Sequence, residues 1–137
     1  MKRILVLCTG NSCRSQMAEG YLRHFANGEA EIYSAGVEMH GLNQDAVSIM
    51  REDGIDIAHH TSNLVDEYAH LDFDFIITVC DNANERCPFF PGKAQRFHQN
   101  FCDPSKVTGS PERQHATFVK TRDAIKAYSQ EFIAAHL

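Results

Sequence analysis

One stretch near the N-terminus decides how this chain folds: Val6-Leu7-Cys8-Thr9-Gly10-Asn11-Ser12-Cys13-Arg14-Ser15. An apolar run leads into Cys8, a small polar turn with one glycine follows, and Arg14 comes where a helical pattern begins. This order predicts a buried strand, a tight turn and the N-terminus of a helix. Backbone N–H groups of such a turn converge on one point, and the positive end of the helix faces the same point. The stretch therefore predicts a site for a tetrahedral oxyanion.

Cys8 and Arg14 are the residues that such a site would use for chemistry. The planar guanidinium of Arg14 can hold two oxyanion oxygens at once. The positive field of the turn favours a thiolate, so we expect the pKa of Cys8 to fall from about 8.5 into the range of about 3.5 to 7.5. A thiolate that faces a bound oxyanion is a nucleophile in position. The alternative is that Cys8 is a buried strand-end cysteine and Arg14 a surface charge. The strand before them, the turn at Gly10 and the helix after them argue against it.

Length and composition limit the classes of protein to which the chain can belong. With 137 residues, of which 43% are apolar, it is long enough for one domain over residues 1–137. A formal net charge of -5 and a pI near 5.9 argue against nucleic-acid binding. The apolar run at 4–7 is too short for a signal peptide, and no stretch is long enough to cross a membrane. We expect a cytoplasmic monomer, in which five cysteines indicate redox chemistry or metal binding.

Apolar patterning predicts alternating strands and helices. Strands are expected at 4–7, 31–35 and 73–79, with a weaker one at 95–101. Helical spacing from Met17 to Phe25 is closed by Asn27-Gly28, and a second helix is expected at about 43–53. Thr61-Ser62 offers caps for a short helix, and 81–91 has the composition of a mobile loop. Ser110-Pro111 is expected to begin the closing helix.

The two strongest strands each end at a cysteine. Cys8 follows the run at 4–7, Cys80 follows the run at 73–79, and Asp103 comes soon after the weaker strand. In an open parallel sheet, ligands bind in the crevice beyond the carboxyl ends of the strands. If the two strands are neighbours, both cysteines face the same crevice.

The motif at 8–15, continued by Gln16-Met17-Ala18-Glu19-Gly20, resembles the loop shared by low-molecular-weight tyrosine phosphatases and thioredoxin-coupled arsenate reductases. The resemblance covers most of the chain, because it continues through Tyr33-Ser34-Ala35-Gly36, His60-Thr61-Ser62, Thr78-Val79-Cys80 and Asp103-Pro104. It implies an α/β fold with an open, parallel, four-stranded, Rossmann-like sheet flanked by helices. It also implies one of two activities.

The number of thiols separates these activities. A phosphatase needs Cys8, Arg14 and an acid to form and hydrolyse a phosphocysteine. An arsenate reductase also needs two electrons, which two thiols supply by closing a disulfide. Cys80 and Cys87 match the thioredoxin-coupled reductases. The resemblance implies that Cys8 attacks arsenate, Cys80 attacks the adduct and releases arsenite, and Cys87 then takes over Cys80, leaving a disulfide for thioredoxin.

The resemblance assigns further roles to positions in this sequence. It makes Asp103 the general acid, Ser15 a hydroxyl donor to the Cys8 thiolate, and Asn11 a brace of the loop. The oxyanion-binding positions are Thr9, Gly10, Asn11, Ser12, Cys13 and Arg14. Some family members bind potassium through positions matching Asn11, Glu19, Ser34 and Thr61, with a carboxylate where this chain has Asn63.

Several alternatives stay open. A phosphatase acting through a phosphocysteine is the second hypothesis, and a non-catalytic oxyanion-binding module is the third. Zinc is disfavoured because no cysteine pair has the tight knuckle spacing. Cys13 is interpreted as structural, and Cys102 as a bystander that is able to divert the disulfide. A glutaredoxin-type partner is an alternative to thioredoxin.

Overall fold

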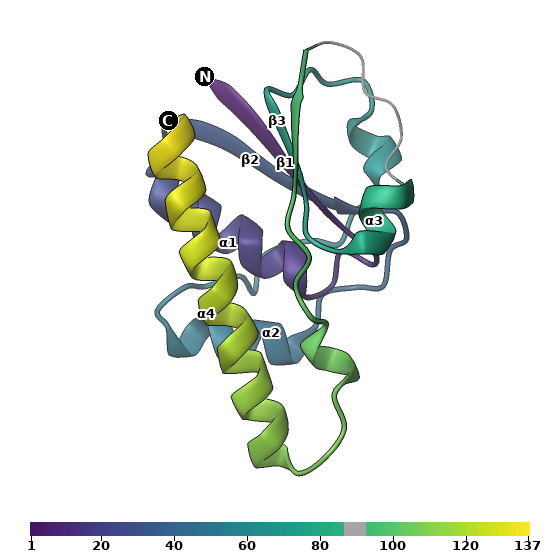
Figure 1. The fold of residues 1–137 in the computed structure, drawn as a ribbon, viewed down its shortest axis with the longest axis vertical. Coiled ribbons are helices and arrows are strands. Elements are labelled where there is room, and N and C mark those ends of the chain that lie inside the picture. The colour runs from purple at the N-terminus through teal and green to yellow at the C-terminus, as the bar shows by residue number, and fades with distance from the viewer. Residues whose placement is uncertain (87–92) are drawn as a thin grey trace.

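The computed structural model describes residues 1–86 and 93–137. Its centre is a parallel sheet of four strands, in the order β2-β1-β3-β4. The strands are β1 (Lys2–Cys8), β2 (Ala30–Gly36), β3 (Phe75–Thr78) and β4 (Gln95–His98). Helices flank this sheet on both faces (Figure 1). The predicted fold class, an open parallel α/β sheet, is confirmed.

The apolar run of β1 makes it an inner strand, buried on both faces. Ile4 and Val6 belong to one hydrophobic cluster, whereas Leu5 and Leu7 belong to another on the opposite face. Such a continuous run is typical of a parallel strand that is covered on both sides.

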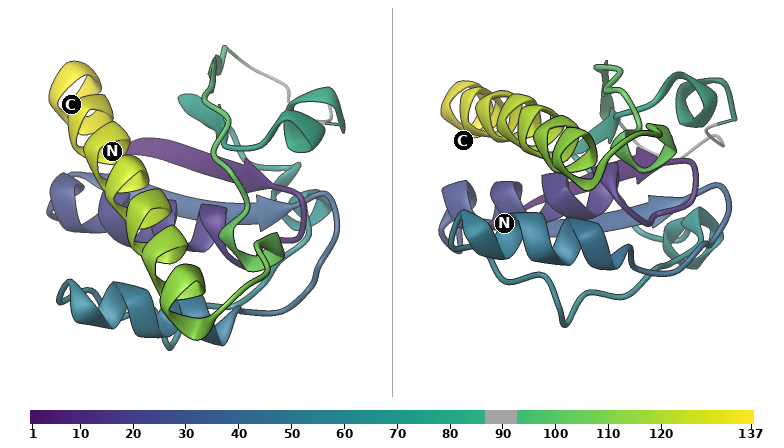
Figure 2. Two further views of the ribbon diagram at one scale, coloured as in Figure 1. Left: turned by 60° about the horizontal axis from the view of Figure 1, so that its bottom comes forward. Right: turned by 90° about the horizontal axis from the view of Figure 1, so that it is seen from below.

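The helices divide unequally between the two faces (Figure 2). Helices α1 (Arg14–Ala26), α2 (Gln44–Glu52) and α4 (Pro111–His136) contribute to the larger cluster. The 3-10 helix η1 (Val65–Tyr68) and the short helix α3 (Asp81–Arg86) contribute to the smaller one. No helix in the described part of the chain is long and apolar enough to cross a membrane.

Helix ends agree with the local signals in the sequence. Helix α1 is followed by Asn27 in the left-handed conformation, with φ of 48°. The Asn43 side chain caps α2 by accepting from the N–H of Ala46. The Ser110 side chain caps α4 in the same way, with Pro111 in the first turn. The predicted helix end at Asn27 and the predicted cap at Ser110 are confirmed, and α2 lies within the predicted range 43–53.

The prediction of a loop at 81–91 is wrong for residues 81–86, which form α3. Ala83 is the single buried residue of this helix, so its sequence carries no apolar periodicity that would predict it. The first turn of this helix is stabilised by the N–H of Asn84, which donates to the carbonyl of Cys80 at 3.1 Å. The remainder of the predicted loop includes 87–91, which lies outside the described residues.

The predicted caps at Thr61 and Ser62 are also wrong, because η1 begins only at Val65 and has no side-chain cap. The Thr61 hydroxyl donates instead to the side chain of Asn63 at 2.8 Å. The Ser62 hydroxyl donates to the carbonyl of Gly10 at 3.2 Å. The Thr61 hydroxyl is thus used by a neighbouring side chain, and the Ser62 hydroxyl by a carbonyl far away in the sequence, so neither caps a helix.

Strand register brings the two cysteines to one edge of the sheet. Strands β1 and β3 are neighbours, and Leu7 pairs with Thr78. Cys8 ends β1, and Cys80 lies two residues beyond Thr78. The expectation that both cysteines reach the same crevice is confirmed.

Candidate active site

A cavity of about 420 Å³ lies at the carboxyl edge of β1 and β3. It is lined by Cys8, Thr9, Gly10, Ser12, Cys13, Arg14, His40, Cys80, Asp81, Asn82, Asn100, Asp103, Ser105 and Lys106. Reasoning from the sequence missed six of the pocket residues: His40, Asp81, Asn82, Asn100, Ser105 and Lys106. Four of these directly follow Cys80 or the Asp-Pro pair and could have been found from them, whereas His40 and Asn100 come from other segments.

The loop between β1 and α1 is supported by the segment that follows β2. The backbone N–H groups of Glu38 and His40 donate to the carbonyls of Thr9 and Gly10, at 2.8 and 2.9 Å. A Cβ at Gly10 would lie 2.2 Å from Nδ1 of His40, so any other residue would have to displace this imidazole. With these carbonyls engaged, the loop N–H groups are suited to bind an anion.

Asn11 braces the loop from beneath, as the resemblance implies. It is fully buried and left-handed, with φ of 48°. Its Oδ1 accepts from the N–H of Asn63 at 2.7 Å, and this bond fixes the orientation of the amide. Its Nδ2 then donates to the hydroxyls of Ser15 and Ser34, at 2.8 and 3.0 Å. The brace therefore ties the loop to α1, β2 and the segment before η1.

Arg14 reaches across the pocket from the first residue of α1. Its Nη1 donates to the carbonyl of Phe101 at 3.0 Å, and its Nη2 lies 3.7 Å from Oδ2 of Asp103. Within the described residues its Nε is buried and has no hydrogen-bond partner. A buried donor without a partner is costly, so this nitrogen suits an oxyanion bound in the pocket.

The thiols of Cys8 and Cys80 are hydrogen-bonded to each other, so the pKa of each depends on the other. The bond with Cys8 is the largest cause that lowers the pKa of Cys80, to about 5. The same bond, together with burial, raises the pKa of Cys8 although Arg14 and the N–H of Ser15 oppose this. The predicted lowering of the Cys8 pKa is therefore wrong, because the bond to Cys80 and burial outweigh the charge of Arg14.

Three further groups hold the Cys80 thiolate. The N–H of Ala83 donates to Cys80 Sγ at 3.3 Å, and Thr9 Oγ1 lies 3.2 Å from the same sulfur. Asn82 Nδ2 donates to Thr9 Oγ1 at 3.0 Å, so the hydroxyl proton of Thr9 is free to point at sulfur. Arg14 also lowers the pKa of Cys80 by its charge.

Ser15 reaches Cys8 through the backbone rather than through its hydroxyl. The N–H of Ser15 donates to the sulfur of Cys8, whereas the hydroxyl oxygen accepts from Asn11. The resemblance implied a bond from the Ser15 hydroxyl to the Cys8 thiolate. The hydroxyl instead pairs with the side chain of Asn11, four residues earlier.

Asp103 is oriented by the residue that follows its proline. It precedes the 3-10 helix η2 (Pro104–Lys106), and its Oδ1 accepts from the N–H and hydroxyl of Ser105, at 3.0 and 2.6 Å. Its other oxygen, Oδ2, is the one that faces Arg14. This carboxyl therefore presents one oxygen to the anion pocket, which suits an acid that protonates a leaving oxygen.

The other cysteines differ in their surroundings. Cys13 is buried within the larger hydrophobic cluster while also contributing to the pocket wall, and burial raises its pKa. Cys102 is exposed. The third cysteine of the predicted relay, Cys87, lies outside the described residues.

Ionic contacts tie both ends of α3 to the rest of the fold. At its first residue, Asp81 lies 2.7 Å from Nε2 of His98 on β4. At its last residue, Arg86 lies 2.7 Å from Glu38, whose other oxygen lies 2.7 Å from His40. Arg86 and then His40 lower the pKa of Glu38. The helix that directly follows Cys80 is thereby linked to the wall of the pocket.

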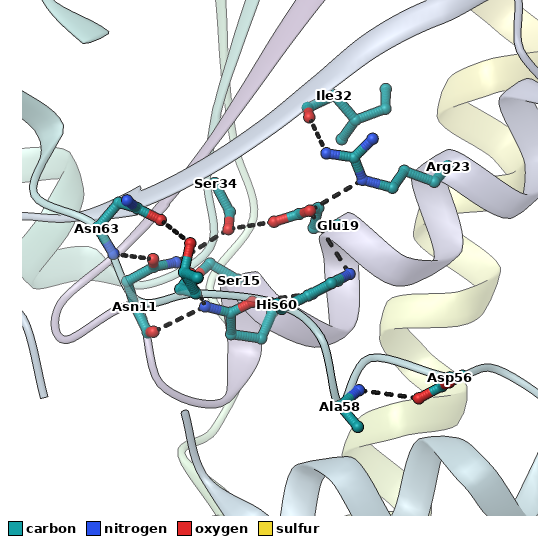
Figure 3. Close-up of polar contacts among 12 residues, drawn as sticks. Asn11, Ser15, Glu19, Arg23, Ile32, Ser34, Asp56, Ala58, His60 and Asn63 are labelled. Atoms are coloured by element: carbon teal, nitrogen blue, oxygen red, sulfur yellow. Dashed lines mark hydrogen bonds and ion pairs between the residues drawn. The ribbon is translucent and has the colours of Figure 1, made fainter. Parts of the chain in front are cut away.

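Glu19 is the centre of a buried polar network behind the loop (Figure 3). Its Oε1 accepts from the hydroxyl of Ser34 at 2.5 Å, and its Oε2 accepts from Nε of Arg23 at 2.8 Å. Ser34 in turn accepts from the Nδ2 of Asn11. Ser34 and Arg23 thus both direct hydrogen-bond donors toward the Glu19 carboxylate.

This network does not fit a potassium ion. Potassium needs several oxygen ligands, whereas Asn11 presents its NH₂ group and Glu19 is already paired with the guanidinium of Arg23. His60 Nε2 also lies 3.5 Å from Glu19. Thr61 directs its hydroxyl to Asn63, which supplies no carboxylate.

The arrangement of loop, pocket and sheet defines the class of protein. The sequence profile of the low molecular weight phosphotyrosine protein phosphatases matches residues 3–136, so the chain belongs to this family. Within it, an arsenate reductase of Shouchella clausii is 47% identical over 135 residues, covering 96% of this chain and 94% of the relative. An arsenate reductase of Bacillus subtilis is 44% identical over 131 residues, with the same coverage. A solved arsenate reductase in the phosphate-binding state superposes with a TM-score of 0.80, at 28% identity and 98% coverage of both chains.

Proposed function

We propose that this protein reduces arsenate to arsenite through Cys8, Cys80 and Cys87, with thioredoxin as the electron donor. The observation that carries the proposal is the contact between the Cys8 and Cys80 thiols inside an oxyanion pocket. The relatives described as arsenate reductases support the substrate.

In the first step arsenate binds to the loop N–H groups and to Arg14, and the sulfur of Cys8 attacks arsenic. The proton of Cys8 passes to the Cys80 thiolate along their hydrogen bond. Asp103 donates a proton to the departing oxygen, which leaves as water. The product is a Cys8–arsenate adduct in which arsenic is still pentavalent.

In the second step Cys80 loses its proton again and attacks the sulfur of Cys8. The electron pair of the sulfur–arsenic bond stays on arsenic, which becomes trivalent, takes up protons and leaves as arsenite. Two thiols have supplied two electrons and form a Cys8–Cys80 disulfide. Cys87 then attacks Cys80, frees Cys8, and leaves a Cys80–Cys87 disulfide that thioredoxin reduces.

Hydrolysis of a phosphoester would use the same first residues, Cys8 and Arg14. It would give no role to a thiolate on Cys80, which would compete with water for the intermediate. The contact between the two thiols therefore favours reduction over hydrolysis. A reducing compartment such as the cytoplasm would keep these thiols available.

A single turnover without any reductant tests the order of the relay. Cys87→Ser is expected to release one arsenite per protein and to stop as a Cys8–Cys80 disulfide, which peptide mass spectrometry detects. Cys80→Ser is expected to release little arsenite, because the Cys8 adduct then has no neighbouring thiol. Cys102→Ser is the matched control, since that cysteine is exposed. Equal bursts from the first two variants would contradict the order.

The electron donor is tested separately by NADPH oxidation with thioredoxin and thioredoxin reductase. Oxidation that depends on arsenate is the expected result. A burst of arsenite without turnover in this coupled assay would mean that another donor, such as a glutaredoxin, serves the enzyme.

A further inference from the structure

The carbonyl groups of the loop between β1 and α1 are held in place by hydrogen bonds. Five of them accept from backbone N–H groups, namely those of Cys8, Thr9, Gly10, Ser12 and Cys13. The carbonyl of Asn11 instead accepts from a side chain, the Nε2 of Gln16, at 3.0 Å. The orientation of this carbonyl therefore depends on a side chain that a substitution can remove.

Gln16 lies in the first turn of α1 and is fully buried. Its Nε2 donates to the carbonyls of Asn11 and Thr61, each at 3.0 Å. Because both amide hydrogens are used, its Oε1 has to accept, and Nδ1 of His60 lies 3.0 Å from this oxygen. His60 therefore carries a proton on Nδ1. The side chain of His60 is only 3% exposed, so this bond fixes the orientation of the Gln16 amide in a place shielded from water.

The peptide between Asn11 and Ser12 connects this contact to the pocket. It is trans, and the N–H of a trans peptide points opposite to its carbonyl. The carbonyl is turned toward Gln16, which is not among the described residues that line the cavity, whereas Ser12 is. Asn11 also has a left-handed backbone, with φ of 48°, and a residue other than glycine keeps such a backbone only where its surroundings hold it.

We propose that Gln16 is a positioning residue for the bound oxyanion, because its hold on the Asn11 carbonyl directs the N–H of Ser12 into the pocket. Without this hold the peptide is free to rotate, and a rotated carbonyl oxygen would face the anion and repel it. Gln16 acts only through the loop, since it does not itself reach the cavity. For the reaction the inference rests on the proposed function, in which the anion at Ser12 is arsenate.

Sulfate binding to the reduced full chain measures this positioning without arsenic chemistry. Sulfate is a tetrahedral dianion that the thiols do not reduce, and calorimetry gives its dissociation constant. Gln16→Met keeps a side chain of similar length and removes both amide hydrogens. We expect it to bind sulfate about tenfold to a hundredfold more weakly, which is the loss expected for one hydrogen bond to a charged group.

Tyr21→Phe is the matched control for a general loss of stability. Tyr21 is a buried residue of the same helix, and its hydroxyl donates to Asp53 at 2.7 Å, away from the loop. Both variants lose a buried hydrogen bond and should melt at a lower temperature than the unmodified protein. Only Gln16→Met should lose sulfate affinity.

A second measurement uses the unmodified protein and does not depend on how any variant folds. In its ¹H–¹⁵N NMR spectrum, sulfate should shift the amide resonance of Ser12, as expected for a donor that contacts the anion. A Ser12 amide that sulfate leaves unmoved would overturn the inference. Unchanged sulfate affinity in Gln16→Met, or equal losses in Gln16→Met and Tyr21→Phe, would overturn it as well.

These outcomes are separate from the test of the proposed function. If the unmodified protein releases its burst of arsenite while Gln16→Met binds sulfate normally, the positioning role is wrong and arsenate reduction stands. If sulfate binds through Ser12 as expected and no arsenite is released, the arsenate chemistry is wrong and the positioning role stands.

Discussion

Replacing Thr9 by valine removes one donor from the Cys80 thiolate and keeps the shape of the side chain. Thr9 Oγ1 lies 3.2 Å from Cys80 Sγ and accepts from Asn82 at 3.0 Å. Its proton is therefore available to the sulfur, and Thr9 is one cause of the low pKa of Cys80, about 5. Because valine cannot donate, we expect the pKa of Cys80 to rise in this variant.

The size of the effect follows from the hydrogen bond that is lost. A hydrogen bond to a charged group contributes about 1.5 to 3 kcal/mol, and the lower end applies because sulfur is a weak acceptor. Since one pH unit corresponds to about 1.4 kcal/mol, the pKa of Cys80 should rise to about 6. At a pH of about 5 the thiolate fraction then falls from about one half to about one tenth. Alkylation of Cys80 should be about fivefold slower there, and unchanged at a pH of about 8.

The assay is the rate of iodoacetamide labelling at Cys80 as a function of pH, read by peptide mass spectrometry. Thr117→Val is the matched control, because its hydroxyl donates to the carbonyl of Arg113 on α4, at 2.9 Å. The control should keep the pH profile of the unmodified protein. If Thr9→Val also kept it, the hydroxyl would not stabilise the thiolate.

Three further perturbations test other parts of the site. Asp103→Asn should slow the first chemical step by about 10² to 10⁴, because it removes the general acid, and an unchanged single-turnover rate would argue against that role. Arg14→Lys should lose most steady-state activity, since an ammonium cannot hold two oxygens as a fork does; near-normal activity would contradict the site geometry. Exchanging sodium for potassium should leave the melting temperature unchanged, because Arg23 and Ser34 already pair with Glu19, and stabilisation specific to potassium would refute this.

The local sequence was sufficient to predict the strand that leads into the loop, the turn of the loop and the start of the last helix. The apolar run of β1, the turn at Gly10 and the cap at Ser110 are features of neighbouring residues, and each occurs as expected. Helix α3 was missed because its polar sequence buries only Ala83. Its first turn is instead stabilised by hydrogen bonds from the N–H groups of Ala83 and Asn84 to Cys80.

The pKa values of the cysteines depend on contacts that the local sequence does not specify. The positive field of the loop was predicted correctly, since Arg14 and the N–H of Ser15 both lower the pKa of Cys8. The larger effect comes from Cys80, which is remote in sequence and adjacent in space. Its distance from Cys8 depends on the pairing of β1 with β3.

The sequence by itself determined the order of strand, anion loop and helix, the α/β class and the cysteines available for chemistry, because these follow from residue types and from periodicity along the chain. Only the tertiary structure decided that Cys80 is hydrogen-bonded to Cys8, that Arg23 is paired with Glu19, and that His40 covers Gly10. Each of these depends on distances between segments far apart in the sequence. Charge, desolvation and hydrogen bonding act over a few ångströms in space, and separation along the chain does not specify those distances.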